Sequence, residues 1–256
     1  MPSTLRPLLI AFAAGAFALA GCATPPPASD PDALAEFRET NDPLEPTNRV
    51  FYNVNNALDT VILRPIALGY RAVTPQPVQT GVHNVLTNLG TPVVFANDVM
   101  QGRPHRAAET MARLLINTTL GIGGMFDVAE RFGVPQHDSD FGMTLAVWGL
   151  PDGVFLFLPV LGPTNPRDTV GFGVDTVMDP FGWIGQGSVV EALRWARTGL
   201  GAIDARAGVL DDLDKIMAQA LDPYATIRSL SRQHRRAQIE AAKAGDSAPP
   251  APKRTP

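Results

Sequence analysis

The stretch VFYNVNNALDTVI, residues 50–62, decides the fold class of this 256-residue chain. Its apolar residues return every three or four positions, which is the period of one face of an α-helix. The Arg64-Pro65 step is expected to end this helix, because a residue before proline avoids the helical conformation. The apolar stripe consists of Val50, Phe51, Val54, Ala57, Leu58, Val61 and Ile62. The stretch therefore predicts an amphipathic helix.

The same period returns along most of the chain. It predicts helices over residues 78–89, 107–120 and 189–210, and the Thr91-Pro92 step is expected to open a separate segment. Asp222-Pro223 has the residue types of an N-cap and a first helical position, so a last helix should start there. No run alternates polar and apolar residues for long. The predicted fold class is all-α.

The N-terminal segment predicts export and lipidation. Arg6 precedes an uncharged apolar run over residues 8–20, which is shorter than the ~17–25 residues that cross a bilayer. The next residues complete Leu19-Ala20-Gly21-Cys22, which resembles the lipobox of bacterial lipoproteins. In a lipobox the cysteine carries a diacylglycerol and becomes the first residue of the mature chain. Cys22 is the only cysteine of the chain, which fits a lipid anchor rather than a disulfide.

The composition divides the chain into four parts. Residues 1–21 are expected to be a signal peptide, and residues 22–32 a lipidated cysteine with a Pro-rich tether. Residues 33–240 should form one helical domain, followed by a disordered basic Pro/Ala tail over residues 241–256. Ala23, in place of an aspartate after the lipidated cysteine, favours the outer membrane over the inner membrane.

The middle of the chain is unusually apolar. Between residues 141 and 166 the only charged residue is Asp152, and three prolines prevent a single spanning helix. In a soluble protein such a segment would be core, whereas in a lipid-anchored protein it would contact acyl chains. The residues that this second interpretation places against the membrane are Trp148, Phe155, Leu156, Phe157, Leu158 and Trp183.

Motifs for catalysis are scarce. The four histidines are dispersed, and no zinc-protease, nucleophile-elbow or phosphate-loop motif occurs. His137-Asp138-Ser139-Asp140 is interpreted as a polar loop, and Asp211, Asp212 and Asp214 as charges at the start of a helix. The formal net charge of −4 argues against a generally basic surface for nucleic acid. We expect neither catalysis nor a cofactor or metal.

Several long motifs together resemble one family. Residues 41–78, LINTTLGIGGMFDVA at 115–129, FGMTLAVWGLPDG at 141–153 with LPVLGPTNPRDTVG at 158–171, and DPY at 222–224 are similar, in this order, to the MlaA/VacJ lipoproteins. The resemblance implies a ring of amphipathic helices in the periplasmic leaflet of the outer membrane, associated with a trimeric porin. Pro46-Thr47 and the 131–140 loop depart from the family pattern.

The resemblance also implies a function. An amphipathic channel through the ring would let misplaced phospholipids leave the outer leaflet for a periplasmic lipid carrier, which maintains lipid asymmetry without a covalent step. Two other classes stay open from the residues alone. One is a membrane-anchored lipid hydrolase, and the other is a structural lipoprotein that organises porins.

A glycine-rich segment is the candidate gate of that channel. Its glycines allow either a hinged hairpin that turns back at Gly133-Val134-Pro135, or a fixed turn in which small residues permit tight packing. The sequence leaves these two alternatives equal. The residues assigned to the channel or gate are Leu120, Gly121, Ile122, Gly123, Gly124, Met125, Phe126 and Leu145.

The lipid anchor can be tested at one residue. Cys22→Ser should abolish acylation and leave an uncleaved or mislocalised precursor, because the thiol is the point of lipid attachment. Metabolic labelling with a palmitate analogue, followed by membrane fractionation, measures this. The wild-type chain is a clean control, since Cys22 is its only cysteine. Label on the Cys22→Ser protein in the outer-membrane fraction would contradict the lipoprotein interpretation.

Overall fold

The computed structural model describes residues 42–185 and 187–244, with residues 26–27, 29–31, 34, 37 and 40 before them. Cys22, the signal peptide and the tail after Ala244 lie outside the described residues, so the predictions about them stay predictions. The predicted end of the helical domain at residue 240 falls inside the last helix, which continues to Ala244.

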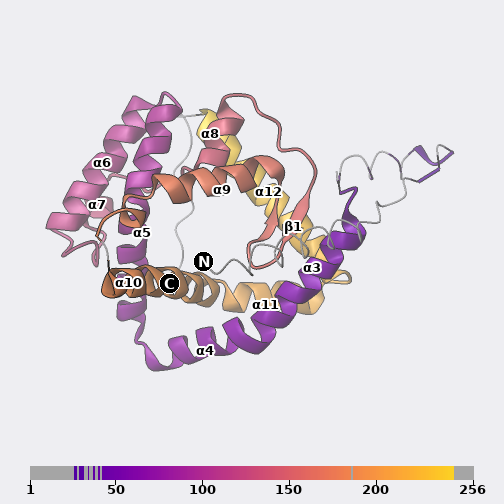
Figure 1. Cartoon of the computed structure of the whole chain (residues 1–256), viewed down its shortest axis with the longest axis horizontal. Coiled ribbons are helices and arrows are strands. Elements are labelled where there is room, and N and C mark those ends of the chain that lie inside the picture. Colours follow the sequence, from indigo (N-terminus) through magenta and orange to yellow (C-terminus); the bar gives the residue numbers. More distant parts are fainter. Residues whose placement is uncertain are drawn as a thin grey trace. The chain divides into compact units, whose positions relative to one another are not determined.

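Helices make up most of the described chain, as Figure 1 shows, which confirms the predicted helical class. The α-helices are α3 (Glu45–Leu58), α4 (Arg64–Val73), α5 (Gln76–Met100), α6 (Pro104–Thr119), α7 (Val128–Arg131), α8 (Phe141–Val147), α9 (Pro166–Met178), α10 (Ser188–Gly208), α11 (Leu210–Gln219) and α12 (Pro223–Ala244). A π-helical turn, η1 (Asp59–Leu63), and a 3-10 turn, η2 (Pro180–Gly182), lie between helices. The strands β1 (Leu156–Leu158) and β2 (Gly162–Thr164) pair antiparallel.

The contacts divide the described residues into two compact units. The first consists of those up to Leu58 with residues 152–166, and the second of those in 59–151 and 167–244. The first unit packs α3 against the β1–β2 hairpin. Phe157 opposes Pro163 in the hairpin, and its ring meets Tyr52 of α3 edge to face at 5.6 Å between centroids. The short two-stranded hairpin of this protein therefore lies at residues 156–164.

Two asparagines of α3 hold the hairpin in place. Asn48 donates to the Phe155 carbonyl at 3.1 Å and accepts from the Phe157 amide at 2.9 Å. Two turns later, Asn55 donates to the Leu158 carbonyl at 2.9 Å and accepts from the Val160 amide at 2.8 Å. The free edge of β1 is therefore paired by side-chain amides instead of a third strand.

The second unit is built around α5. Figure 1 shows α6 lying along α5, and α5 also contacts α8 and α10. α10 packs against α4 as well, where Ala67, Ala207 and Leu210 form a small apolar cluster beside Tyr70. α12 packs on α8, and α7 packs on α6. Only small residues and one leucine form this cluster, so apolar packing alone does not explain how the helices are held.

Three predicted helix boundaries are wrong. The backbone stays helical through Arg64-Pro65, because η1 precedes α4 and the proline takes an early position that needs no N–H donor. α5 runs through Pro92, where an interior proline costs about 3 kcal/mol. Packing of α5 on α6 and α10 offsets this penalty. The helix predicted over residues 189–210 ends at Gly208, and α11 starts at Leu210.

Other local predictions are confirmed. α6 covers the predicted helix over residues 107–120 apart from its last residue. The Asp222 carboxylate accepts from the Ala225 amide at 3.1 Å at the start of α12, as an N-cap does. Asp211 and Asp212 lie in the first turn of α11. Their negative charges stabilise α11, because the N-terminal end of a helix dipole is positive.

The apolar stripes of several helices point outward. On α3 the side chains of Val50, Val54 and Leu58 are exposed, and Val61 in η1 is 74% exposed. On α10 the exposed apolar residues are Val189, Leu193 and Leu200, whereas Arg206 is buried. The buried set instead includes many polar residues: Asp42, Asn48, Asn88, Asn97, Asp98, Gln101, Arg106, Thr110, Arg113, Asn117, Ser139, Thr144, Arg167 and Arg206. Apolar side chains such as Met143, Phe157 and Tyr224 are buried as well, but so many buried polar residues are unusual for a water-soluble fold.

None of the helices within the described ranges has the length and apolarity needed to cross a membrane.

The asparagine contacts of the hairpin can be tested at Asn48. Asn48→Ala should lower the free energy of unfolding of the first unit by about 1–3 kcal/mol, because it leaves the buried Phe157 amide and Phe155 carbonyl without their partner. Urea unfolding in detergent micelles and hydrogen exchange of the Phe157 amide measure the loss. Asn53→Ala is the matched control, since Asn53 is exposed on the same helix. Equal effects of the two variants would contradict the assignment.

Candidate functional site

Three polar residues on one stretch of α5 start the polar interior of the second unit. Asn97 and Asp98 are fully buried, and Gln101 follows one turn later. Gln101 donates to the Ser139 hydroxyl at 2.9 Å and to the Thr144 hydroxyl at 3.0 Å. Since a buried amide is costly without partners, these contacts fix where the 139–144 segment meets α5.

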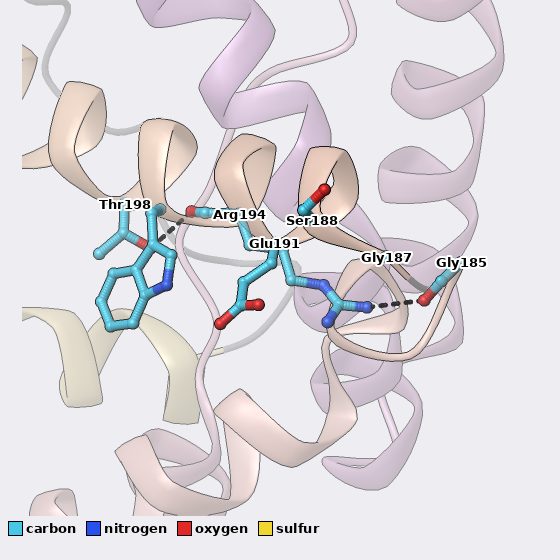
Figure 2. A pocket seen from close by; sticks show the side chains of 7 residues that line it. Gly185, Gly187, Ser188, Glu191, Arg194 and Thr198 are labelled. Carbon is cyan, nitrogen blue, oxygen red and sulfur yellow. Dashed lines mark hydrogen bonds between the residues drawn. The ribbon is translucent and has the colours of Figure 1, made fainter.

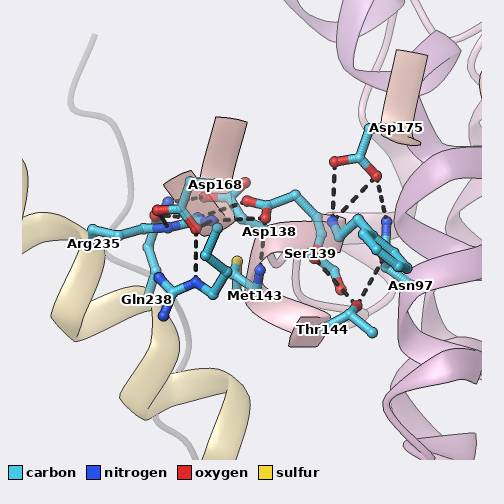
Figure 3. A network of polar contacts seen from close by, with 12 residues as sticks. Asn97, Asp138, Ser139, Met143, Thr144, Asp168, Asp175, Arg235 and Gln238 are labelled. Atoms are coloured by element: carbon cyan, nitrogen blue, oxygen red, sulfur yellow. Dashed lines mark hydrogen bonds and ion pairs between the residues drawn. The ribbon is translucent and has the colours of Figure 1, made fainter. Parts of the chain in front are cut away.

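Asn97 connects α5 to α8 and α9. Its side-chain amide donates to the Asp175 carboxylate at 2.8 Å, and its oxygen accepts from the Thr144 hydroxyl at 2.8 Å. Figure 3 shows Asn97 between Asp175 and Thr144. Asp175 also accepts from the Phe141 amide at 3.0 Å, at the first turn of α8. Burial raises the pKa of Asp175, and these hydrogen bonds oppose that rise. Three helices therefore meet at one buried amide.

Asp98 holds a second group of polar side chains. Its Oδ2 accepts from the Thr110 hydroxyl at 2.6 Å and lies 2.9 Å from His137 Nε2. These residue types also occur in catalytic triads, but Thr110 is 2% exposed and its proton is directed to the carboxylate rather than to the imidazole. The arrangement ties the 131–140 loop to α5 and α6 and offers no accessible nucleophile.

Arg235 of α12 is the centre of the ion-paired cluster in Figure 3. It binds Asp140 through two contacts of 2.6 and 2.8 Å, and Asp168 through two contacts of 2.9 Å. Burial alone would raise the pKa of Asp168, but the guanidinium groups of Arg235 and Arg167 hold it below its usual value. The pKa of Arg235 is raised correspondingly, since its contacts with the two carboxylates outweigh burial. This cluster joins α12 to the starts of α8 and α9.

The glycine-rich turn, residues 120–126, rests on the polar side of α5. A Cβ at Gly121 would overlap the carbonyl oxygens of Asn117 and Phe126, and a Cβ at Gly124 would overlap Asn88. The Gly124 amide donates to the Asn117 carbonyl at 2.8 Å. The glycines are therefore needed for close packing, which favours the fixed turn over the hinged hairpin.

The C-terminal end of this turn is also pinned. Asn84 of α5 donates to the Met125 carbonyl at 3.1 Å, and Arg113 binds Asp127 at 2.6 Å. Burial raises the pKa of Asp127, but the hydrogen bonds from Arg113 and Asn117 more than compensate and lower it. Asp127 then caps α7 through the Glu130 amide. Amide and charged side chains therefore hold the end of the turn in place.

The apolar side chains of the turn are exposed, and that of Met125 also lies over Gly81 of α5. Leu120, Ile122, Met125 and Phe126 are all exposed, and Ile122 adopts a left-handed conformation with φ of 54°. A β-branched residue rarely adopts that conformation, so the surrounding contacts impose it. The candidate gate thus presents an apolar edge over a polar base. Leu145 lies elsewhere, half-buried on α8.

A shallow pocket lies at the N-terminal end of α10. Figure 2 shows the labelled side chains of Ser188, Glu191 and Arg194 around it, together with Gly185 and Gly187. Arg194 donates to the carbonyls of Phe181, Ile184 and Gly185 at 3.1–3.3 Å. Its guanidinium therefore caps the η2 segment rather than projecting freely into the pocket.

The structure separates the residues predicted to face the membrane. Trp148 and Trp183 are exposed, and Leu156 and Leu158 are half-buried. Phe155 and Phe157 are 3% and 4% exposed, so the prediction that they face lipid is wrong. Both lie in or beside β1, where alternate side chains point inward against α3. The apolar segment of residues 141–166 is thus partly core, which is what the interpretation of it as the core of a soluble protein predicts.

Sequence analysis missed the polar interior. A signal for it exists in α5, where Gly81, Asn84 and Asn88 recur at helical spacing and mark the face that meets the turn. Asn97 and Gln101 are again one turn apart, but their distance from Asn88 along the helix places them on its opposite side. Polar residues that recur at helical spacing would have indicated these two inward faces. Arg235 and Asp168 have no comparable local signal, because 67 positions separate them.

Helices that expose apolar side chains and bury paired charges are typical of proteins that sit among acyl chains. The fold and the polar interior thus have the features of a helical protein of the membrane surface. The chain is 34% identical over 239 residues to the "Intermembrane phospholipid transport system lipoprotein MlaA" of Haemophilus influenzae, which covers 91% of this chain and 90% of that protein. It is 35% identical over 224 residues to the protein of the same name from Escherichia coli K12, covering 86% and 84%.

A solved structure described as "Structural basis for maintenance of bacterial outer membrane lipid asymmetry" matches the fold. The TM-score is 0.66 at 32% identity, over 77% of this chain and 98% of that chain. The model of the MlaA lipoprotein family matches residues 40–238. This chain belongs to the MlaA lipoprotein family, which confirms the resemblance of its motifs.

The ion-paired cluster can be tested at Arg235. Arg235→Met should lower the free energy of unfolding by roughly 2–4 kcal/mol at neutral pH, because Asp140 loses its ion pair and Asp168 keeps only Arg167 in a largely buried site. Urea unfolding followed by circular dichroism in detergent micelles measures the change. Arg236→Met is the matched control, since Arg236 is the exposed neighbour on α12. A loss of the same size in both variants would contradict the role of the cluster.

The same variants have a pH signature. The lowered pKa of Asp168 gives stability that is fully present above the unfolded value of about 4 and is lost as the pH falls through the lowered pKa. Wild type and Arg236→Met should therefore lose stability on acidification over this window. Arg235→Met should lose less stability over this window, because the pKa of Asp168 is lowered less once the Arg235 guanidinium is removed.

Proposed function

We propose that this chain is an outer-membrane lipoprotein that removes mislocalised phospholipids from the outer leaflet. It passes them through an amphipathic channel to a periplasmic lipid carrier for retrograde transport, which maintains lipid asymmetry. The names of the relatives support this function, and the inverted distribution of polar and apolar residues is the observation that carries it. The step moves a lipid without breaking a bond, so the proposed role is transport and not catalysis.

The proposed location is the periplasmic leaflet of the outer membrane. Exposed apolar side chains on α3, η1 and α10 suit contact with acyl chains, and the described helices are not long and apolar enough to span. A helix of this kind lies in the plane of one leaflet. Acyl chains on Cys22 would add a permanent anchor, and a ring of helices would then surround the path of the lipid.

The proposed path must suit both ends of a phospholipid. An acyl chain needs apolar contact, which the exposed side chains of Leu120, Ile122, Met125 and Phe126 offer. An anionic headgroup needs polar contact, since burying a charge among acyl chains is costly. The polar face of α5 behind the turn provides amide groups at Asn84 and Asn88. The turn is therefore the proposed boundary between the two environments.

The proposed partners follow from the two ends of the path. A trimeric porin would support the protein in the membrane and give access to the outer leaflet. A soluble periplasmic carrier would receive the lipid, because an acyl chain cannot cross the aqueous periplasm unprotected.

A crosslink of the turn to α5 tests both the function and the gate. A Cβ at Gly81 would lie 3.1 Å from the Met125 Cγ, so Gly81→Cys with Met125→Cys places two thiols within disulfide reach. In cells that lack the native gene, the reduced double variant should keep phosphatidylethanolamine out of the outer leaflet. Oxidation should leave it low, because the backbone of the turn is already held on α5, whereas a rise to the level of cells without the protein would indicate a hinged gate. Labelling of intact cells with an amine reagent that does not cross the membrane measures it.

The two single-cysteine variants are the controls for oxidation, and porin association should be the same in all strains. Outer-leaflet phosphatidylethanolamine that stays low with the crosslink complete would make the turn a static scaffold and leave the transport function intact. No rise in cells without the protein would reject transport itself. Lysophospholipid that depends on the protein would indicate a hydrolase. Porin association without any effect on lipid would indicate a structural lipoprotein.

A further inference from the structure

All three tryptophans of the chain are exposed, although an indole is large and mostly apolar. Trp148 is 58% exposed, and Trp183 and Trp195 are both 70% exposed. An indole also carries one N–H donor, which needs an acceptor wherever water is absent. Hydrocarbon offers no acceptor, so the partner of each N–H indicates which environment the ring tolerates.

The indole of Trp148 is satisfied within the protein. Its N–H donates to the Met100 carbonyl at 3.1 Å, and its ring meets Phe141 edge to face at 6.0 Å between centroids. Met100 is the last residue of α5, so its carbonyl has no partner in its own helix. One contact therefore satisfies an indole donor and a helix-terminal acceptor. Leu150, two residues on, adds an exposed apolar side chain.

Trp183 repeats this arrangement at another helix end. Its N–H donates to the Val177 carbonyl at 2.7 Å, and Val177 lies in the last turn of α9. That carbonyl is again one that the helix leaves without a partner. The neighbouring side chains of Val177 and Ile184 are exposed and apolar. Two exposed indoles thus cap the C-terminal ends of two helices, and both ends are suited to surroundings without water.

Trp195 differs from the other two. Among the described residues, none accepts a hydrogen bond from its indole N–H. It lines the pocket at the start of α10 with Glu191 one turn before it, and with Ser188 and Thr198. Glu191 is an exposed carboxylate, which is not stable in hydrocarbon. The surroundings of Trp195 therefore supply water or lipid headgroups as acceptors.

We propose that Trp148 and Trp183 lie among the acyl chains of the membrane, whereas Trp195 lies at the headgroup level. The proposal rests on the membrane location proposed above and adds the depth of three defined points of the second unit. In this assignment the ends of α5 and α9 that the two indoles cap lie in the acyl-chain region of the membrane. The start of α10 lies at the polar boundary of the membrane.

Fluorescence of single-tryptophan proteins tests the proposal, because two Trp→Phe changes leave one emitter in the full lipidated chain. The probe is a phosphatidylcholine vesicle with bromine either near the carbonyl end or near the middle of the acyl chain. Trp148 and Trp183 should be quenched most by mid-chain bromine and least by acrylamide in the water. Trp195 should show the reverse order and a longer emission wavelength. Circular dichroism verifies that each variant keeps its helices.

The outcomes separate this proposal from the proposed function. Trp195 quenched by mid-chain bromine as strongly as Trp148 and Trp183 would overturn the depth assignment, and so would Trp148 or Trp183 quenched by acrylamide but not by bromine. In both cases the membrane location would still hold. Bromine that quenches none of the three would reject the membrane location itself. If a double variant loses its helices, the three single Trp→Phe variants give the same assignment from the quenching that each one removes.

Discussion

Buried polar groups in this protein find most of their partners within the protein, and the rest of the structure depends on these contacts. The exposed surface carries a large share of the apolar side chains, whereas arginines, carboxylates and amides lie inside. A water-soluble domain stabilises helix packing mainly by removing apolar area from water. Here the second unit has only a small apolar cluster, so directional contacts carry more of the specificity.

Directional contacts have a consequence that apolar packing lacks. The net contribution of one hydrogen bond to stability is only about 0.5–1.5 kcal/mol, but a buried group that loses its partner lowers stability by more than that. A misplaced helix would therefore be penalised at several groups together. Asn97 shows this, since it joins α5 to Thr144 of α8 and to Asp175 of α9. Arg235 does the same between α12 and two carboxylates. Helix positions are thus defined even where the outer face of a helix is apolar and exposed.

The helices were predictable from sequence, but their inward faces were not. Periodicity shows that Val189 and Leu193 share one side of α10, but it does not show whether that side meets core or lipid. The interior proline of α5 escaped prediction because packing on α6 and α10 outweighs a local signal. Phe155 and Phe157 were misassigned because a three-residue strand gives too short an alternation to recognise. Long-range pairs such as Arg235 with Asp168 leave no pattern in a single sequence.

The glycine-rich turn shows how this constraint limits motion. Its backbone donates to the Asn117 carbonyl through Gly124, and its Met125 carbonyl accepts from Asn84. Swinging the whole turn away would break these contacts and leave buried polar groups without partners, which is unfavourable. Side-chain rotation of Met125 or Phe126 breaks none of them. Motion at this turn therefore proceeds most easily through its exposed apolar side chains, over a backbone that stays in place.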